Sequence, residues 1–255
     1  APVESAAPGG VGAVGGPDGP HAGSGAADDV HDVGGLTAVL ALWPAVGTLV
    51  DEGALRLHTP LTAYGDEAAA DTPAGTTAHH LLTHPGGTAA LTRLVEHLSG
   101  STLAELAAVR VWNPLGMTRT RLADGTLRAP LADLALFLRH VLHPSGPGGP
   151  GAPRDGGGAS APAPLTRAWT AESLRIRTGE LTPARGLLWH PAPHGVWTHH
   201  APTDPGPAVW ISPRHHRWAV LLPAGRGPLR TTFREAVFTP DASTRGSGPG
   251  GIPRA

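Results

Sequence analysis

The sequence predicts an α+β fold in which one antiparallel sheet packs against helices. Three observations predict it. Apolar residues recur at helical spacing through the middle of the chain, strand-like segments follow a Gly/Pro-rich stretch near the end, and turn residues separate these segments. Helices followed by strands in this order favour a mixed fold. At 255 residues the chain is long enough for one domain with a single core.

The N-terminal part should contribute little to the sheet. Residues 10–14 and 20–25 resemble remnants of two strands, but glycine is a poor strand former, so we expect reduced N-terminal strands. The apolar run 36–52 ends before Gly53, which is typical of a helix stop, and Pro44 predicts a kink within it. This run should be the central, buried helix.

The remaining elements follow the same two periodicities. An N-cap at Ser101, supported by Glu105, predicts the start of one of the helices. The expected further helices span residues 77–83, 89–98, 103–111 and 130–142. The expected strands span residues 186–190, 195–200, 208–212 and 217–223. Trp189, Trp197, Trp210 and Trp218 fall in these strands, where aromatic side chains usually pack between sheet and helix.

Glycine and proline set the expected domain limits. The 36 glycines and 28 prolines concentrate near both ends and in one internal stretch. We therefore expect a Gly/Pro-rich segment at residues 1–25, one domain at 26–240 with a flexible linker at 144–164, and a disordered tail at 241–255.

Composition excludes several functions. All 19 basic residues are arginines, they are balanced by 20 acidic residues, and no basic patch suited to nucleic acid is evident. The absence of cysteine removes thiolate nucleophiles, disulfides and cysteine-ligated zinc. The longest apolar stretch contains Pro44 and is too short to span a membrane, and no signal-peptide pattern is visible. We expect a soluble protein, whose compartment the sequence leaves open.

Several motifs in fixed order carry a resemblance. They read DVGGLTA (32–38), LVDEGALRLHTPL (49–61), TAHHLLTHPGG (77–87), LVEHLSG (94–100), NPLGM (113–117) and DLALFL (133–138). Together they resemble the serine β-lactamase, D-Ala-D-Ala carboxypeptidase and esterase superfamily, nearest its class C branch. The resemblance covers most of the chain and implies a penicillin-binding protein-like fold.

The resemblance also implies a mechanism whose residues can be sought. In this superfamily a serine at the start of the central helix attacks an acyl carbon, and a lysine three positions later helps to remove its proton. A tyrosine from a second motif assists, and a third motif, of the Lys-Thr-Gly or His-Thr-Gly type, lines the pocket. Backbone amides form the oxyanion hole.

Each of the three motifs is degenerate in this sequence. Gly35 stands at the serine position and Ala38 at the lysine position. The segment that should carry the tyrosine is missing between Gly87 and the helix near residue 94, and the single tyrosine, Tyr64, lies outside it. The closest counterparts of the third motif begin at His199 or His200, without the expected glycine.

Two hypotheses follow from this pattern. The first is a serine hydrolase relative that has lost catalysis, a pseudoenzyme that uses the remnant cleft for a small-molecule ligand or has no selected role. The alternative is an active hydrolase or acyltransferase that acts on an ester or amide, with a relocated nucleophile or a histidine base. Candidate pocket residues are His84, His199, His200 and Trp197, and the three histidines are the available bases.

Two other candidates are weaker. Thr37 lies two residues beyond the nucleophile position, about 200° round an α-helix from it, and no base is identified for it. His80 and His84 have the i, i+4 spacing of a metal site, but Leu81 follows His80 where a zinc protease needs glutamate, and Pro85 closes the helix. We expect neither a metal nor a cofactor, and the sequence identifies no protein partner.

Overall fold

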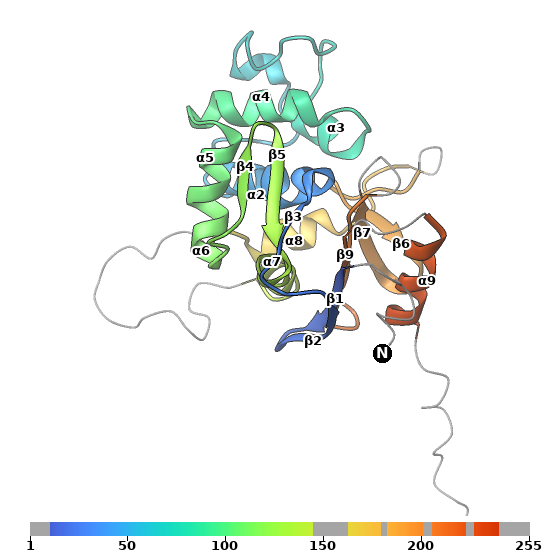
Figure 1. Cartoon of the computed structure of the whole chain (residues 1–255). Coiled ribbons are helices and arrows are strands. Elements are labelled where there is room, and N and C mark those ends of the chain that lie inside the picture. The colour runs from blue at the N-terminus through green and yellow to red at the C-terminus, as the bar shows by residue number, and fades with distance from the viewer. Residues whose placement is uncertain (1–10, 145–162, 180–182, 201–205, 223–226, 240–255) are drawn as a thin grey trace, which may run out of the picture.

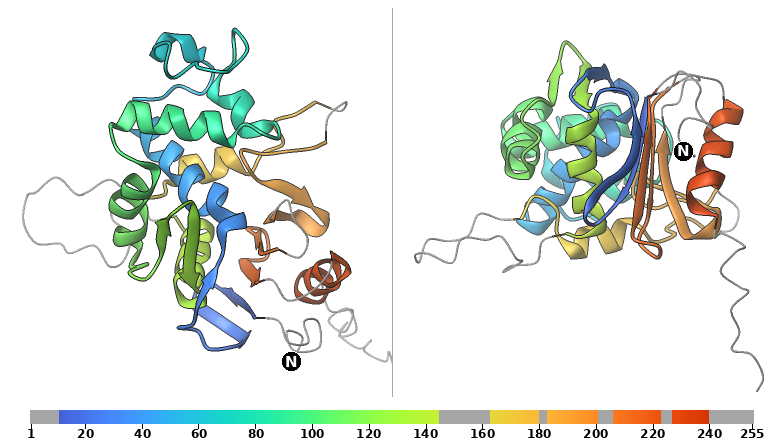
Figure 2. Two further views of the ribbon diagram at one scale, coloured as in Figure 1. Left: turned by 45° about the horizontal axis from the view of Figure 1, so that its top comes forward. Right: turned by 60° about the horizontal axis from the view of Figure 1, so that its bottom comes forward.

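The computed structural model describes residues 11–144, 163–179, 183–200, 206–222 and 227–239. A six-stranded antiparallel sheet separates its helices into two groups (Figure 1). Most helices lie on one face of this sheet, and α9 (Gly227–Phe238) covers the other face, as the edge-on view in Figure 2 shows. This arrangement confirms the expected α+β fold with an antiparallel sheet packed against helices.

The large sheet joins the two ends of the described chain. Its strand order is β2-β1-β9-β8-β7-β6, so the N-terminal hairpin pairs with the last strand. A three-stranded sheet with the order β3-β5-β4 lies among the helices. The strands are β1 Gly12–Gly16, β2 Gly19–Ser24, β3 Val30–Asp32, β4 Arg121–Ala123, β5 Thr126–Pro130, β6 His190–Ala192, β7 Val196–His200, β8 Ala208–Ser212 and β9 Arg217–Leu221.

Glycine is required at Gly15 in the N-terminal strand β1 because the Trp218 side chain packs directly against it. A Cβ atom on Gly15 would lie 2.4 Å from Trp218 Cζ2 and 2.4 Å from the carbonyl oxygen of Gly19. The indole Nε1 of Trp218 also donates a hydrogen bond of 3.0 Å to the carbonyl oxygen of Gly16. The glycines that lower strand propensity are therefore what lets β1 lie against the Trp218 ring of β9.

The helices follow the expected segments, with three unexpected additions, α6, α8 and α9. The α-helices are α2 Trp43–Asp51, α3 Ala78–Thr83, α4 Thr88–Ser99, α5 Leu103–Ala107, α6 Asn113–Leu115, α7 Leu131–Leu142, α8 Arg167–Ser173 and α9. The other helical turns are η1 Gly34–Leu36, η2 Ala38–Leu42, η3 Leu61–Tyr64, η4 Ala108–Trp112 and η5 Pro193–Gly195.

The central helix is interrupted where Pro44 predicted a kink. It begins as the 3₁₀ turn η1, continues as the π turn η2 and becomes regular only in α2. Pro44 has no N–H to donate to the carbonyl oxygen of Leu40. The indole Nε1 of Trp112 donates to that oxygen instead, at 2.8 Å. The second π turn, η4, likewise ends just before an Asn-Pro pair, at Pro114.

Two local predictions were wrong. The cap of α5 is Thr102 rather than Ser101, because the Thr102 hydroxyl accepts from the N–H of Glu105 and the Glu105 carboxylate accepts from the N–H of Thr102. The predicted strand 186–190 is mostly a turn: the Gly186 N–H donates to the Trp189 carbonyl at 2.7 Å, and Leu188 has a φ of 62°. Only its last residue enters β6.

Tryptophans hold the core on both faces of the sheet. The Trp43 ring lies 5.8 Å from Trp189 and 6.0 Å from Trp169, between ring centroids, and its Nε1 donates to Ser173 Oγ at 2.8 Å. Trp210 packs beneath α9. The expected core role is confirmed for Trp189, Trp210 and Trp218, which are buried, whereas Trp197 is half-buried.

Some predictions concern residues outside the described ranges. Most of the expected linker 144–164 and the whole expected tail 241–255 lie there, and the domain limits stay predictions. Within the described ranges, no helix has both the length and the apolar character needed to cross a bilayer.

Candidate functional site

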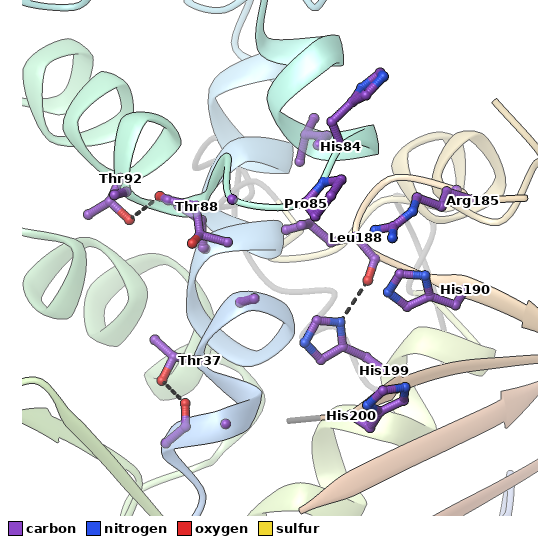
Figure 3. Close-up of a pocket in the computed structure, with 18 of the residues that line it drawn as sticks. Thr37, His84, Pro85, Thr88, Thr92, Arg185, Leu188, His190, His199 and His200 are labelled. Carbon is purple, nitrogen blue, oxygen red and sulfur yellow. Dashed lines mark hydrogen bonds between the residues drawn. The ribbon is translucent and has the colours of Figure 1, made fainter. Parts of the chain in front are cut away.

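A cleft of about 940 Å³ opens beside the start of the central helix (Figure 3). One wall, here called the helix wall, consists of residues 34–38 and the connection between α3 and α4. The opposite wall, here called the sheet wall, consists of the turn 185–188 and the adjoining parts of β6 and β7. Gly35 and Ala38 both line the cleft, so the two positions that the resemblance assigns to the nucleophile and its lysine face this space.

The helix wall carries one hydroxyl next to these positions. Thr37 lines the same cleft, although an α-helix would turn it about 200° away from Gly35. The reason is that the cleft encloses the beginning of the helix rather than one side of it, so Gly34, Gly35, Thr37 and Ala38 all border it. The Thr37 hydroxyl donates a hydrogen bond of 2.8 Å to the carbonyl oxygen of Gly34.

The connection between α3 and α4 is short. Helix α3 ends at Thr83 and α4 begins at Thr88, so no segment intervenes that would carry the tyrosine motif of the superfamily. A Cβ on Gly87 would lie 2.4 Å from the carbonyl oxygen of Leu81, which shows how closely the two helices are joined. His84 lines the cleft from this connection, and its Nδ1 lies 3.1 Å from the carbonyl oxygen of His80.

Tyr64 has a structural role at a different place. Its hydroxyl accepts from the N–H of Arg56 at 2.8 Å and donates to the Arg56 carbonyl oxygen at 3.3 Å. It is absent from the described lining of the cleft. The single tyrosine therefore tethers the loop after α2.

His199 is the best-defined imidazole of the sheet wall. Its Nδ1 lies 2.8 Å from the carbonyl oxygen of Leu188, and because a carbonyl only accepts, Nδ1 carries the proton and Nε2 has a free lone pair. Burial is the main cause that lowers the pKa of His199 to about 4; the hydrogen bond to Leu188 raises this pKa, and the neighbouring His190 and His200 lower it. The ring is therefore neutral near pH 7.

His190 adds a second neutral ring to this wall. It lies on β6, with its ring centroid 6.1 Å from that of His199 and 6.2 Å from that of His200. Burial, followed by the charge of Arg185, lowers the pKa of His190 to about 4. Arg185 is the one permanently charged side chain among the described residues that line the cleft.

Sequence reasoning placed some of these residues but missed others. The structure brings Gly35, Ala38, His84, His199 and His200 to one cleft. The sequence patterns did not indicate Arg185 and His190, although pairing the expected strands 186–190 and 195–200 as a hairpin would have placed His190 beside the other two histidines. Nothing in the sequence around Arg185 indicated that the turn folds back over the cleft.

Trp197 lies behind the sheet wall instead of lining the cleft. A Cβ on Gly186 would lie 3.0 Å from Trp197 Cζ3, so the indole backs the turn that borders the cleft. Trp197 itself lines a second cavity of about 630 Å³.

The histidine pair with metal-like spacing is engaged in helix capping. His80 Nδ1 accepts from the N–H of Thr77 at 3.3 Å, and the rings of His80 and His84 are 6.2 Å apart. Throughout the part of the chain that the structure describes, no group of three or more His, Asp or Glu side chains is placed to hold a metal ion.

The fold is similar to that of several solved structures, whereas comparison of the sequence with family models and curated proteins gave no match. A β-lactamase from Mycobacterium bovis is 20% identical, with a TM-score of 0.64, over 91% of this chain and 96% of that one. A class C β-lactamase from Rhodobacter sphaeroides is 13% identical, with a TM-score of 0.70, over 90% and 94%.

A third neighbour is named for a different activity. A D-stereospecific amidohydrolase from Streptomyces is 14% identical, with a TM-score of 0.65, over 90% of this chain and 93% of that one. Identities this low show the fold alone. The chain therefore has a β-lactamase/transpeptidase-like fold, in agreement with the resemblance of its motifs.

Proposed function

We propose that this protein is a relative of the serine hydrolases that has lost acylation chemistry and binds a small molecule in the remaining cleft. One observation carries the proposal: the two lining positions that should hold a nucleophile and its base are Gly35 and Ala38. Neither side chain can attack a carbonyl or accept a proton, and loss of the nucleophile removes the covalent route.

The other hydroxyls of the cleft support this proposal. Thr37, Thr88 and Thr92 are the described lining residues that carry one. The Thr37 hydroxyl is bonded to a backbone carbonyl, as is that of Thr92, which donates to Thr88 at 2.9 Å. An activated nucleophile instead needs a general base within about 3 Å of its hydroxyl.

The lining also suggests a ligand class. At neutral pH the sheet wall offers one cation, Arg185, and neutral imidazoles on His190 and His199. Aliphatic side chains such as Leu42 and Leu103 border the rest of the space. We therefore propose a small molecule with one carboxylate, an apolar body and donors that can bond to imidazole nitrogen.

Acylation is the direct test of lost catalysis. Purified protein is incubated with a fluorescent penicillin and with an activated ester, and intact mass is then measured. We expect no covalent adduct in either reaction. A stoichiometric adduct that is absent from heat-denatured protein would contradict the proposal.

Ligand binding is tested separately, with benzylpenicillin as a monocarboxylate probe in titration calorimetry. We expect reversible binding that Ala38→Trp abolishes by filling the cleft and that Arg185→Gln weakens about tenfold, the usual scale for one charge-assisted hydrogen bond. Arg128→Gln, an exposed change on β5 outside the cleft, is the control. Binding that survives Ala38→Trp would rule out the cleft as the site for this probe.

A second candidate function, histidine-assisted hydrolysis, has one observation in its favour. The tautomer of His199 leaves Nε2 available as a general base. Its pKa of about 4 argues against efficiency, because the best general bases have pKa values near the working pH. Hydrolysis of a small ester that is lost in His199→Gln, His200→Gln or His84→Gln, with folding intact, would establish this function, and turnover that all three leave unchanged would dismiss it.

A further inference from the structure

The second cavity is strongly basic. It has a volume of about 630 Å³, lies between the end of α7, one face of α8 and the turn from β8 to β9, and shares no lining residue with the cleft. Three arginines and two histidines border it, and none of its described lining residues is acidic. Its polar lining residues are Arg167, Thr170, Arg175, Arg214, His143 and His216.

These cations come from separate parts of the chain. Arg167 and Thr170 stand one turn apart on α8, so both face the same side of that helix. Arg214 and His216 belong to the turn between β8 and β9, and His143 follows α7. Five positive or protonatable groups therefore converge although their elements are distant in sequence.

The local acidic groups only partly balance this charge. Glu172 lies 3.7 Å from Arg175, and both side chains are largely exposed, so this ion pair is weak. Within the described residues, neither Arg167 nor Arg214 has a carboxylate within 4 Å. An anion in the cavity would be attracted by at least these two guanidinium groups.

A buried hydroxyl supplies an independent indication of a ligand. Thr170 is 5% exposed and lines the cavity, yet its Oγ1 has no hydrogen-bond partner among the described residues. A buried hydroxyl left without a partner costs roughly 1–3 kcal/mol, so such groups are rare in folded proteins. A ligand oxygen at the base of the cavity would accept this hydrogen bond.

Two stacked imidazoles complete the site. The rings of His143 and His216 lie 5.3 Å apart and nearly parallel, at 15°. Burial and then the charge of His216 lower the pKa of His143, as do Arg139 and Arg167, whereas Asp18 raises it. A bound anion would favour the protonated form of His143, so binding and protonation should support each other.

We propose that this second cavity is a binding site for a compact phosphate-type oxyanion, held by Arg167, Arg214 and the hydroxyl of Thr170. Guanidinium groups match the geometry of such anions through paired N–H donors, and the threonine hydroxyl adds a neutral donor from the buried side. The site is independent of the small molecule proposed for the cleft.

Titration calorimetry with inorganic phosphate, in a phosphate-free buffer of low ionic strength, tests the site. We expect saturable binding with one phosphate per chain, and about a tenfold loss of affinity in Arg167→Gln and in Arg214→Gln. Arg128→Gln makes the same charge change on an exposed strand away from the cavity and should leave the affinity unchanged. Absence of saturable binding, or an equal loss in Arg128→Gln, would overturn the proposal.

Thr170→Val separates a built site from a merely basic surface. The substitution keeps the side-chain volume but removes the unpartnered hydroxyl, so the phosphate-free protein should melt no lower than the wild type. We expect phosphate affinity to fall severalfold nonetheless. Unchanged affinity in this variant would overturn the role of the hydroxyl and leave only non-specific attraction.

The pH dependence of phosphate affinity gives a further measurement. As the pH falls and His143 gains a proton, the affinity of the wild type should rise relative to that of His143→Gln; the comparison cancels the change of inorganic phosphate from dianion to monoanion, which both proteins share. The same pH dependence in both proteins would show that His143 does not contact the bound ion and would overturn its place in the site.

Discussion

The two walls of the cleft differ in almost every chemical respect. The helix wall presents glycine, alanine and threonine at the positions next to the start of the central helix. The sheet wall presents Arg185 and three histidines, with the ring of His190 6.1 Å from that of His199 and 6.2 Å from that of His200. In the serine hydrolases that the motifs resemble, the serine and the lysine belong to the helix side, and here Gly35 and Ala38 stand at those two positions.

The two walls would contribute differently to binding of the proposed ligand. Small residues on the helix wall leave the space open, and the neutral imidazoles of the sheet wall can donate and accept hydrogen bonds there. The hydrogen bond from His199 to Leu188 also ties β7 to the turn that closes the cleft. For the ligand that we propose, the charged and imidazole contacts would therefore come mainly from the sheet wall.

The largest expected effect comes from the packing behind the sheet wall. A Cβ on Gly186 would lie 2.1 Å from the carbonyl oxygen of Ser173, a backbone atom that cannot move aside. Gly186→Ala should therefore lower the free energy of unfolding by about 3 kcal/mol, measured by urea denaturation. Gly86→Ala, on the helix wall, meets no atom within 4 Å and should cost only about 1 kcal/mol for its φ of 83°. Equal losses would show that the two walls are packed alike.

The second effect is the pH dependence that His199 of the sheet wall contributes to stability. The pKa of His199 is about 4 in the folded protein and 6.5 for a freely solvated histidine, so the unfolded chain takes up a proton first as the pH falls. Its contribution to stability is complete above pH 6.5 and is lost as the pH falls to 4, on the order of 3 kcal/mol.

Denaturation at several pH values checks this effect. His199→Gln should flatten the loss of stability between pH 7 and pH 4.5, whereas His21→Gln, at an exposed position on β2, should retain it. If the free energy of unfolding falls with pH by the same amount in both variants, His199 is not the cause of this loss.

The smallest effect belongs to the helix wall. Thr37→Val removes the hydrogen bond to the Gly34 carbonyl and should cost about 1 kcal/mol of unfolding free energy. Because we propose no nucleophilic role for this hydroxyl, any residual turnover of a small ester should be unaffected. Loss of turnover in this variant would instead identify the threonine as a relocated nucleophile.

Local patterns predicted one strand to its ends and missed some helices altogether. The strand 208–212 was predicted with the bounds of β8, because it combines continuous burial with clear turn residues on either side. Helix α9 was missed although Leu229, Phe233 and Val237 recur at four-residue spacing, which is a helical signal. Its position depends on the apolar outer face of the sheet, where Phe233 packs on Trp210, and that face exists only after folding.

In the cleft, too, contacts that form only on folding could not be predicted from the sequence. Motif order located Gly35 and Ala38, and the sequence position just before a strand located His199. The tautomer of His199 depends on the Leu188 carbonyl, which reaches the ring only because the chain reverses at Leu188 with a positive φ. Long-range backbone contacts of this kind leave no periodic signal in a sequence.

The π turn in the central helix also affects how this chain is compared with others. A π turn holds about one residue more than an α-helical turn of the same rise, so side chains after Leu42 are rotated by roughly 100° from the positions that a regular helix would assign. If this helix is aligned without a gap to a regular α-helix, either Gly35 or Leu49 is therefore assigned to the wrong face of the helix. Superposition of backbones, rather than counting along the helix, gives the correct equivalence between the empty nucleophile position and the buried face that follows it.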